Sequence, residues 1–374
     1  MSTALTRDFA VVGGGLVGAA IAVGLARVGL KPLVLDGEDL DMRASRANFA
    51  LVWVQGKGVG APHYALWSKA SAELWPSFAG DLFENTGIDV RLRQTGGFSF
   101  ALSRDELDHL REDLETIESE TKRASPPYEV LSHNETKERL PELGREVVGS
   151  IYSPADGDVN SLRLLRALHI AMQRAGIDYR SRHLIDKIEP VNGAFRLTGR
   201  WGSVTVQRVV LAAGIDNQRL SPMVGLSTPL RSSKGQILVT EKCAPFLPFA
   251  SGTIRQADEG GVMIGDSEET NATTVAEHTD VATVLARRAI KTFPLLADVN
   301  VIRTWAGFRV DTVDGLPIYE QSAQFPGAYV VTSHSAVTLA AGHALSLAPQ
   351  IARGSLSGDF DPFRSGRFHV RQAA

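Results

Sequence analysis

A single cysteine, Cys243, occurs among the 374 residues of this sequence. One cysteine cannot form an intrachain disulfide, and it cannot supply the several thiolates that hold an iron–sulfur cluster. The histidine and acidic residues show no spacing that suits a metal ion either. We therefore expect a reducing compartment and no metal site in this chain.

The sequence has no excess of charge of one sign. It contains 39 lysine and arginine residues against 42 aspartate and glutamate residues, so the formal net charge is −3, with a pI of about 6.3. Surfaces that bind nucleic acids or anionic membranes need clustered basic residues. We expect no nucleic-acid partner.

Long apolar segments suited to a membrane are also missing. Residues 9–26 and 321–352 contain no Asp, Glu, Lys or Arg, and a span needs about 18 to 20 apolar residues. However, the first segment holds five glycines and no signal-peptide cleavage site, and the second holds two histidines and two prolines. We expect a cytoplasmic protein without a transmembrane segment, which would reach the inner membrane only through a partner or an electron acceptor.

Glycine, by contrast, is abundant. The chain has 35 glycines, more than the roughly 7% of an average protein. Its 44% hydrophobic and 22% charged residues are typical of a folded enzyme. Because domain size has a mode near about 100–150 residues, the length predicts about two domains. The sequence has no low-complexity linker, so we expect these domains to interleave.

The glycines cluster first in a strand–turn–helix–strand segment near the N-terminus. Residues 8–12 are typical of a buried strand, residues 13–18 read Gly-Gly-Gly-Leu-Val-Gly, and residues 19–28 are typical of an alanine-rich helix. A second apolar run at residues 32–35 ends at Asp36. The segment therefore predicts a β-α-β unit.

Three of these glycines, Gly13, Gly15 and Gly18, have the G-x-G-x-x-G spacing of a dinucleotide-binding turn. The first glycine permits the tight turn, the second admits a pyrophosphate close to the backbone, and the third allows close helix packing. Asp36 can accept hydrogen bonds from a ribose hydroxyl, and its charge disfavours a 2′-phosphate. The motif predicts an adenine dinucleotide but does not decide between FAD and NAD. A glycine-rich structural turn is the alternative.

Further segments along the chain favour FAD. They are Arg-Ala-Ser-Arg-Ala-Asn at residues 43–48, Val-Val-Leu-Ala-Ala-Gly at 209–214, Trp-Ala-Gly-Phe-Arg at 305–309 with Asp-Gly-Leu-Pro at 314–317, and Ser-His-Ser-Ala-Val-Thr-Leu at 333–339. In this order they resemble the D-amino-acid-oxidase-type family of FAD-dependent amine oxidoreductases, which includes glycine and sarcosine oxidases. The resemblance runs from about residue 8 to residue 368. Within the family, residues 46–60 are most similar to the smaller, β-type subunits of opine (octopine or nopaline) and hydroxyproline dehydrogenases.

The resemblance implies a fold that is α/β plus α+β. A Rossmann-like FAD-binding domain would be interleaved with a substrate domain built on an antiparallel sheet. We expect the FAD-binding domain to comprise residues 1–80, 145–225 and 305–374. The substrate-binding domain would comprise residues 81–144 and 226–304.

The resemblance also implies a set of cofactor-binding residues. A helix beginning near Ser335 would direct its N-terminal amides at N1 and the C2 carbonyl of the flavin; an ordinary buried helix is the alternative. The complete set is Gly13, Gly15, Leu16, Val17, Gly18, Asp36, Gly37, Arg43, Ala44, Ser45, Ala47, Asn48, Leu184, Ala212, Ala213, Gly214, Gly307, Arg309, Ser335, Ala336, Val337, Thr338 and Leu339.

The catalytic candidates begin with Arg309, which falls where family members place the arginine that clamps the substrate carboxylate. A planar guanidinium makes a bidentate, charge-assisted pair and would orient the substrate Cα–H. His334 is a candidate contact for the ring or the substrate, and a packed structural histidine is its alternative. Glycine-oxidase-like members have a second arginine where this chain has Ser335-Ala336-Val337. The candidates for additional cations are Lys57 and Arg255, with Arg231 and Lys234.

The cofactor and partner expectations follow from departures from the family pattern. Cys243 is far in sequence from the C-terminal helix where a flavin-linking cysteine would lie, so we expect noncovalent FAD. Residues 159–166 contain no histidine that could anchor FMN covalently; noncovalent FMN at a subunit interface stays open. An iron–sulfur centre would belong only to a partner, expected to be a larger α-type subunit.

We expect the chain to oxidise the C–N bond of an amino acid or secondary amine, with opines as the preferred class. It would act as the catalytic β-type subunit of a hetero-oligomeric dehydrogenase, with hydride passing to flavin N5 and the imine then hydrolysed. One alternative is a stand-alone glycine, sarcosine, D-amino-acid or hydroxyproline oxidase that uses O2. Others are a noncatalytic FAD-bearing scaffold subunit and, on cofactor grounds alone, an NAD-dependent dehydrogenase.

Overall fold

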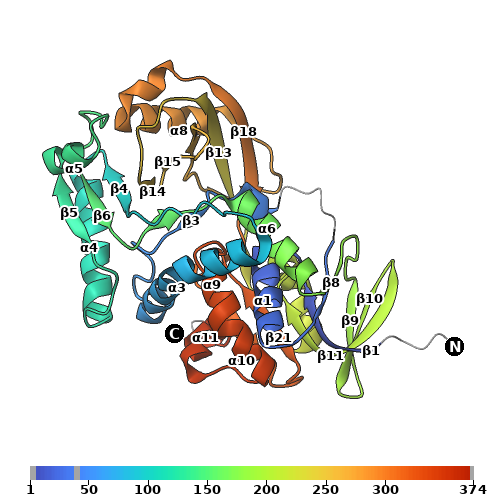
Figure 1. Ribbon diagram of the computed structural model, residues 1–374. Coiled ribbons are helices and arrows are strands. Elements are labelled where there is room, and N and C mark those ends of the chain that lie inside the picture. Colours follow the sequence, from blue (N-terminus) through green and yellow to red (C-terminus); the bar gives the residue numbers. More distant parts are fainter. Residues whose placement is uncertain (1–5, 38–42, 371–374) are drawn as a thin grey trace.

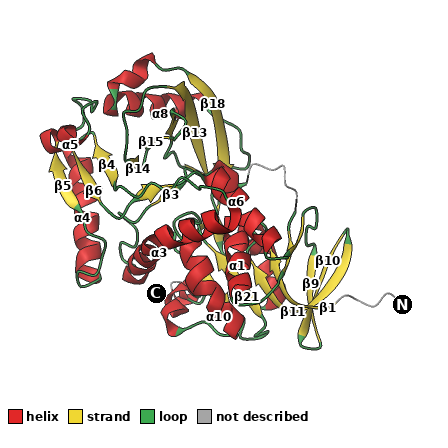
Figure 2. Ribbon diagram, viewed as in Figure 1, coloured by secondary structure: helices red, strands yellow, loops and turns green. Residues whose placement is uncertain are grey.

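The computed structural model describes residues 6–37 and 43–370. Figure 1 shows two halves: one holds a parallel sheet with helices against it, and the other holds antiparallel sheets with helices at their outer edges. Colouring by secondary structure shows that most of the long helices gather in and beside the parallel-sheet half (Figure 2). The chain passes between the halves more than once, as the missing linker predicted.

The parallel sheet is the frame on which the N-terminal glycine motif sits. In spatial order its strands are β20 (Ile318–Gln321), β21 (Ala328–Thr332), β11 (Gly202–Leu211), β1 (Thr6–Val12), β2 (Leu33–Leu35) and β8 (Asp178–Arg180), and the hairpin β9 (Lys187–Val191)–β10 (Ala194–Gly199) extends β11. All neighbours from β21 to β8 pair in parallel, and β20 is antiparallel. The strand order reverses between β1 and β11, and ligands of such sheets bind beyond the carboxyl ends of the strands at that point.

Several helices cover this sheet and share one apolar core with it. They are α1 (Leu16–Arg27), α3 (Pro62–Thr86), α6 (Ser161–Arg174) and α10 (Ala348–Arg353). Helix α1 ends where Gly29 takes a φ of 86°, a conformation that glycine adopts without steric cost. Ile21 and Leu25 of this helix are fully buried and pack in one cluster with Trp75 of α3. Burial of the helix faces therefore fixes the turn before α1 against the sheet.

The C-terminal helix differs from the uninterrupted helix expected from Ser335. Residues 336–339 form turns, α9 (Ala340–Gly342) follows, and the chain then widens into a π-helical segment at His343–Leu347 before α10. Ala348 donates its N–H to the carbonyl five residues earlier, and the next residue, Pro349, has no N–H to donate. The proline explains the wide turn, because its ring excludes the regular hydrogen bond.

The second half is built on two antiparallel-type sheets. The first contains β15 (Ile254–Gln256), β16 (Gly261–Ile264), β13 (Ser233–Lys242), β17 (Glu269–Thr270) and β18 (Val301–Phe308); the second contains β14 (Ala250–Ser251), β4 (Gly97–Ala101), β6 (Gly149–Ser153) and β5 (Glu129–Ser132). Their helices are α4 (Arg104–Glu120), α5 (His133–Arg139) and α8 (Thr279–Thr292). Two-stranded pairs, β3 (Leu51–Val52) with β7 (Gly157–Asp158) and β12 (Leu230–Arg231) with β19 (Asp311–Thr312), complete the strands, and α2 (Ala44–Ala47), α7 (Asn217–Leu220) and α11 (Arg367–Val370) are the remaining short α-helices of the described residues.

Two expected domain boundaries need correction. The boundary at residue 145 would put β6 with the parallel sheet, but β6 pairs with β4 and β5. The boundary at residue 305 would cut β18, which pairs with β13 along its length. Within residues 6–37 and 43–370, no helix is long and apolar enough to cross a membrane.

Candidate functional site

A cavity of about 960 Å³ lies between the two halves. This volume is near the upper end of ligand sites, about 300–1,000 Å³. Its walls come from the turns after β1, β2, β11 and β21, from α2, and from the opposed strands β13 and β18. One continuous space therefore joins the carboxyl edge of the parallel sheet to the antiparallel half.

The glycine turn forms one wall of this cavity. Gly13 has a φ of 108°, and a Cβ on it would lie 2.3 Å from the carbonyl oxygen of Ala212. The N–H of Leu16 donates to Ser45 Oγ at 2.9 Å, whereas the N–H groups of Gly15 and Val17 find no acceptor among the described residues. Free amides at the start of a 12-residue helix suit an anion such as a pyrophosphate.

Next to this turn, Asp36 ends β2 with its side chain in a fixed orientation. Its carboxylate accepts hydrogen bonds from the Tyr179 hydroxyl at 3.1 Å and from Arg43 Nη1 at 2.6 Å. Gly37, Arg43 and Leu184 line the same end of the cavity. This end therefore has the acid for a ribose and an apolar side chain for a base, as the sequence predicted.

At the other end of the parallel sheet, residues 335–338 line the cavity. The N–H groups of Val337 and Thr338 have no acceptor within residues 6–37 and 43–370. The helix starts later than expected, but its preceding turns still offer amides to the cavity. Leu339 is fully buried outside the cavity wall.

Gly18 and Ala212 also lie behind the cavity wall. A Cβ on Gly18 would lie 1.9 Å from the Gly13 carbonyl oxygen, so Gly18 sets the distance between α1 and the turn. Gly307 lines the wall, and a Cβ on it would lie 2.6 Å from Ala47 Cβ. Gly18 and Ala212 can therefore shape the cavity without contacting a ligand.

Lys57 forms a polar cluster with the turn before the last helix. Its Nζ donates to Ser335 Oγ at 2.8 Å and to Thr338 Oγ1 at 3.0 Å. The Tyr64 hydroxyl also donates to Ser335 Oγ, at 2.9 Å. Burial lowers the pKa of Lys57 to about 7, although the charge of Asp156 acts in the opposite direction. This ammonium group therefore titrates near neutral pH.

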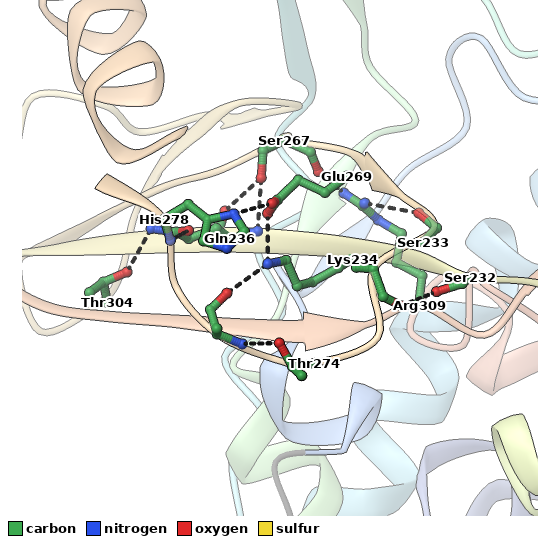
Figure 3. Close-up of polar contacts among 12 residues, drawn as sticks. Ser232, Ser233, Lys234, Gln236, Ser267, Glu269, Thr274, His278, Thr304 and Arg309 are labelled. Atoms are coloured by element: carbon green, nitrogen blue, oxygen red, sulfur yellow. Dashed lines mark hydrogen bonds and ion pairs between the residues drawn. The ribbon is translucent and has the colours of Figure 1, made fainter. Parts of the chain in front are cut away.

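Arg309 enters the cavity from the end of β18 with its guanidinium held from the antiparallel half. Nη2 donates to the Ser267 carbonyl at 2.6 Å, and Nη1 donates to Ser233 Oγ at 3.4 Å (Figure 3). A Cβ on Gly235 of β13 would lie 2.8 Å from Nη2. Gly235 therefore leaves room for the guanidinium, and two bonds fix its orientation.

The other expected cations lie outside the cavity wall. Arg255 pairs with Asp158 at 3.2 Å, Arg231 pairs with Asp311 at 2.5 Å, and Lys234 pairs with Glu269 at 3.1 Å (Figure 3). Of these four described candidates, Lys57 alone lines the cavity. This placement corrects the role expected for Arg255, because a guanidinium buried against an acid outside the cavity cannot reach a ligand there.

His334 lines the cavity between the two cations that remain. Burial, reinforced by the charges of Arg309 and Lys57, lowers the pKa of His334 to about 3. The imidazole is therefore neutral over the physiological range. It can exchange a hydrogen bond with a ligand but cannot serve as a third positive charge.

The cavity wall also contains residues that sequence reasoning missed. Trp53 and Gln55 belong to the segment that carried the resemblance, so inspection of that segment could have found them. Asp266 and Arg288 come from the end of β16 and from α8, where no motif marks them. These are the residues that only the meeting of the two halves brings together.

The geometry fits FAD, because the cavity offers an acid for ribose, free amides for a pyrophosphate and a second set of free amides beside the antiparallel half. These features define a two-domain dinucleotide-dependent oxidoreductase. The family described as "DAO: FAD dependent oxidoreductase" matches residues 8–350, and the chain belongs to this family. It is an FAD-dependent oxidoreductase, and both the predicted family and the predicted fold class are confirmed.

Particular relatives agree over nearly the whole chain. Two proteins named as one of the subunits of opine oxidase, from Agrobacterium tumefaciens (strain Ach5) and Rhizobium meliloti, are 59% and 58% identical over 366 residues, covering 98% of this chain and 99% of each relative. The crystal structure of glycine oxidase from Geobacillus kaustophilus superimposes with a TM-score of 0.85 at 26% identity, covering 96% of this chain and 98% of that one.

Proposed function

We propose that this chain is the catalytic β-type subunit of an enzyme of opine catabolism, and that it oxidises the C–N bond of a secondary-amine substrate such as octopine or nopaline. The observation that carries this proposal is the fixed guanidinium of Arg309 in the cavity that fits FAD. The high identity to the two proteins named as opine oxidase subunits supports the same substrate class.

In this reaction the residues of the chain bind and orient the substrate. Arg309 holds a carboxylate of the substrate, and Lys57 supplies a second positive charge for a further carboxylate. The positive field of both groups favours the uncharged amine. Bound FAD supplies the two-electron acceptor, whose N5 takes the Cα hydride, and water then hydrolyses the resulting imine to an oxo acid and an amine. The amides of Val337 and Thr338 would hold the flavin near its N1.

The pKa of Lys57 gives this proposal a pH dependence. Lys57 is charged below about pH 7 and neutral above it, so the carboxylate loses a partner as the pH rises. We expect kcat/KM, which reports the free enzyme, to lose a contribution through an inflection near pH 7. The profiles of Lys57→Arg and Lys57→Met measured on the assembled enzyme check this, because arginine stays charged and methionine never is. An inflection near pH 7 that persists in both variants would contradict the role.

Partner and cofactor attachment complete the proposal. Cys243 lies against the Gly260 carbonyl, at 3.7 Å, and outside the cavity wall, which supports noncovalent FAD. Electrons would leave through FMN at a subunit interface or an iron–sulfur centre on a larger α-type partner. The relatives are named as one subunit of opine oxidase, and this naming supports a hetero-oligomer.

The test is copurification of the chain with its partner, followed by anaerobic mixing with a panel of amines. Bleaching of the flavin absorption by opines supports the proposal, and bleaching by none of the amines would exclude catalysis. Peroxide released in air by the isolated chain, with glycine or sarcosine as substrate, would instead identify a stand-alone oxidase.

A further inference from the structure

We propose that Asp266 selects substrates that carry a cationic side chain beyond the carboxylate held by Arg309, with a guanidinium as the best fit. This inference deepens the proposed function and rests on it for the substrate class. It assigns a specificity role to a residue that no motif in the sequence marks.

The position of Asp266 is fixed by its neighbours on the chain. It follows β16 and Gly265, whose N–H donates to the Thr253 carbonyl at 2.9 Å. Ser267, the next residue, accepts from Arg309 through its carbonyl, as Figure 3 shows. The Asp266 carboxylate therefore lies beside the guanidinium that would hold the substrate, on a loop tied to the sheet on both sides.

Asp266 differs from every other acid in the cavity wall. The wall contains Asp36, Glu106, Asp113, Asp216 and Asp266. The first four each have a basic partner within the chain, namely Arg43 at 2.6 Å, Arg288 at 2.9 Å, His109 at 3.8 Å and Arg219 at 2.8 Å. Asp266 has no hydrogen bond or ion pair to any of the described residues, although its side chain is exposed to the cavity. Its carboxylate is thus available to a ligand.

The surrounding charges locate Asp266 relative to the reacting end of the cavity. His334 feels the charges of Arg309 and Lys57. Asp266 feels Arg309 and Arg288 of α8 instead. Arg309 is therefore common to both environments, and Asp266 lies on its far side from Lys57 and the turn at residues 335–338. A substrate whose carboxylate binds Arg309 and whose amine faces that turn would direct its side chain toward Asp266.

The chemistry of this position favours a guanidinium. Burial raises the pKa of Asp266 above its usual range, although Arg309 acts in the opposite direction. A partly desolvated carboxylate gains most from a cation that reaches it with two parallel N–H donors. The Arg288 guanidinium is already occupied, since Glu106 accepts from it at 3.0 and 2.9 Å. The missing positive charge must therefore come from the substrate.

The experiment compares Asp266→Asn with the wild type in the FAD-loaded complex. Titration calorimetry measures binding of two opines that differ only in side chain, one built on arginine and one on alanine, and steady-state kinetics follows both. We expect Asp266→Asn to weaken binding and kcat/KM for the arginine-built opine about 10- to 100-fold, since a mismatched charge pair costs roughly 1.4 kcal/mol per factor of ten. The alanine-built opine should change less than about 3-fold.

Glu268→Gln is the matched control, because it removes the same charge two residues away and outside the cavity wall. It should leave the preference between the two opines unchanged. Equal binding of both opines by the wild type, or an equal loss for both in Asp266→Asn, would overturn the inference. If neither opine is oxidised but the Asp266-dependent binding preference remains, the proposed function fails and the inference stands.

Discussion

Replacing Arg309 with alanine is expected to raise KM for the amine substrate by roughly 30- to 4,000-fold, while FAD stays bound. The range corresponds to about 2–5 kcal/mol, the usual cost of truncating one partner of a buried, hydrogen-bonded charge pair. The effect falls on the substrate because the guanidinium is held by Ser267 and Ser233 of the antiparallel half. Steady-state kinetics of the assembled enzyme gives KM, and the flavin absorption gives FAD content.

Two further variants separate charge from position. Gly235→Ala keeps Arg309, but its Cβ would lie 2.8 Å from the guanidinium nitrogen, so the side chain must move and KM should rise. Arg287→Ala removes an exposed arginine from α8 that does not line the cavity, and KM should not change. An unchanged KM in Arg309→Ala would eliminate the carboxylate clamp.

The second large effect is expected for Gly18→Ala, which should yield protein without bound FAD and with a lower Tm. The new Cβ would lie 1.9 Å from the Gly13 carbonyl oxygen, an atom of the backbone that cannot rotate away. Helix α1 would have to move from the turn, and the amides of Gly15 and Val17 would move with it. Overpacking of this kind costs about 1–3 kcal/mol or more.

Gly80→Ala is the control for this prediction. Gly80 lies in α3, and nothing lies within 4 Å of a Cβ placed on it. Alanine is a better helix former than glycine, so this variant should keep its FAD and gain up to about 1 kcal/mol. Flavin absorption and thermal unfolding of both purified variants decide the matter. Full FAD occupancy in Gly18→Ala would show that α1 does not depend on this close contact.

The N-terminal β-α-β unit could be predicted from sequence because all its signals are local. The apolar run of β1, the glycine spacing and the alanine-rich α1 lie within about one turn or strand of one another, and Asp36 follows directly. The start of the C-terminal helix was predicted less well. Residues 335–339 have helical composition, but the turns there are set by contacts with distant residues, such as the Lys57 bond to Ser335.

The antiparallel half limited sequence reasoning more strongly. The boundary expected at residue 145 failed because β6 pairs with strands that are distant in sequence. Arg255 and Lys57 are both basic residues in apolar surroundings, and their sequence contexts do not distinguish them. The structure separates them, since Arg255 has Asp158 as a partner outside the cavity and Lys57 faces the cavity.

The sequence alone therefore determined the dinucleotide turn, the family and the arginine at position 309, because each depends on residue types at short, fixed spacings. Only the tertiary structure decided which charged groups remain available to a ligand. Whether a carboxylate or guanidinium is already paired depends on side chains far away in sequence, as Asp266 and Glu106 show. The pairing of charges across the two halves, rather than their number in the chain, sets the chemistry of the cavity.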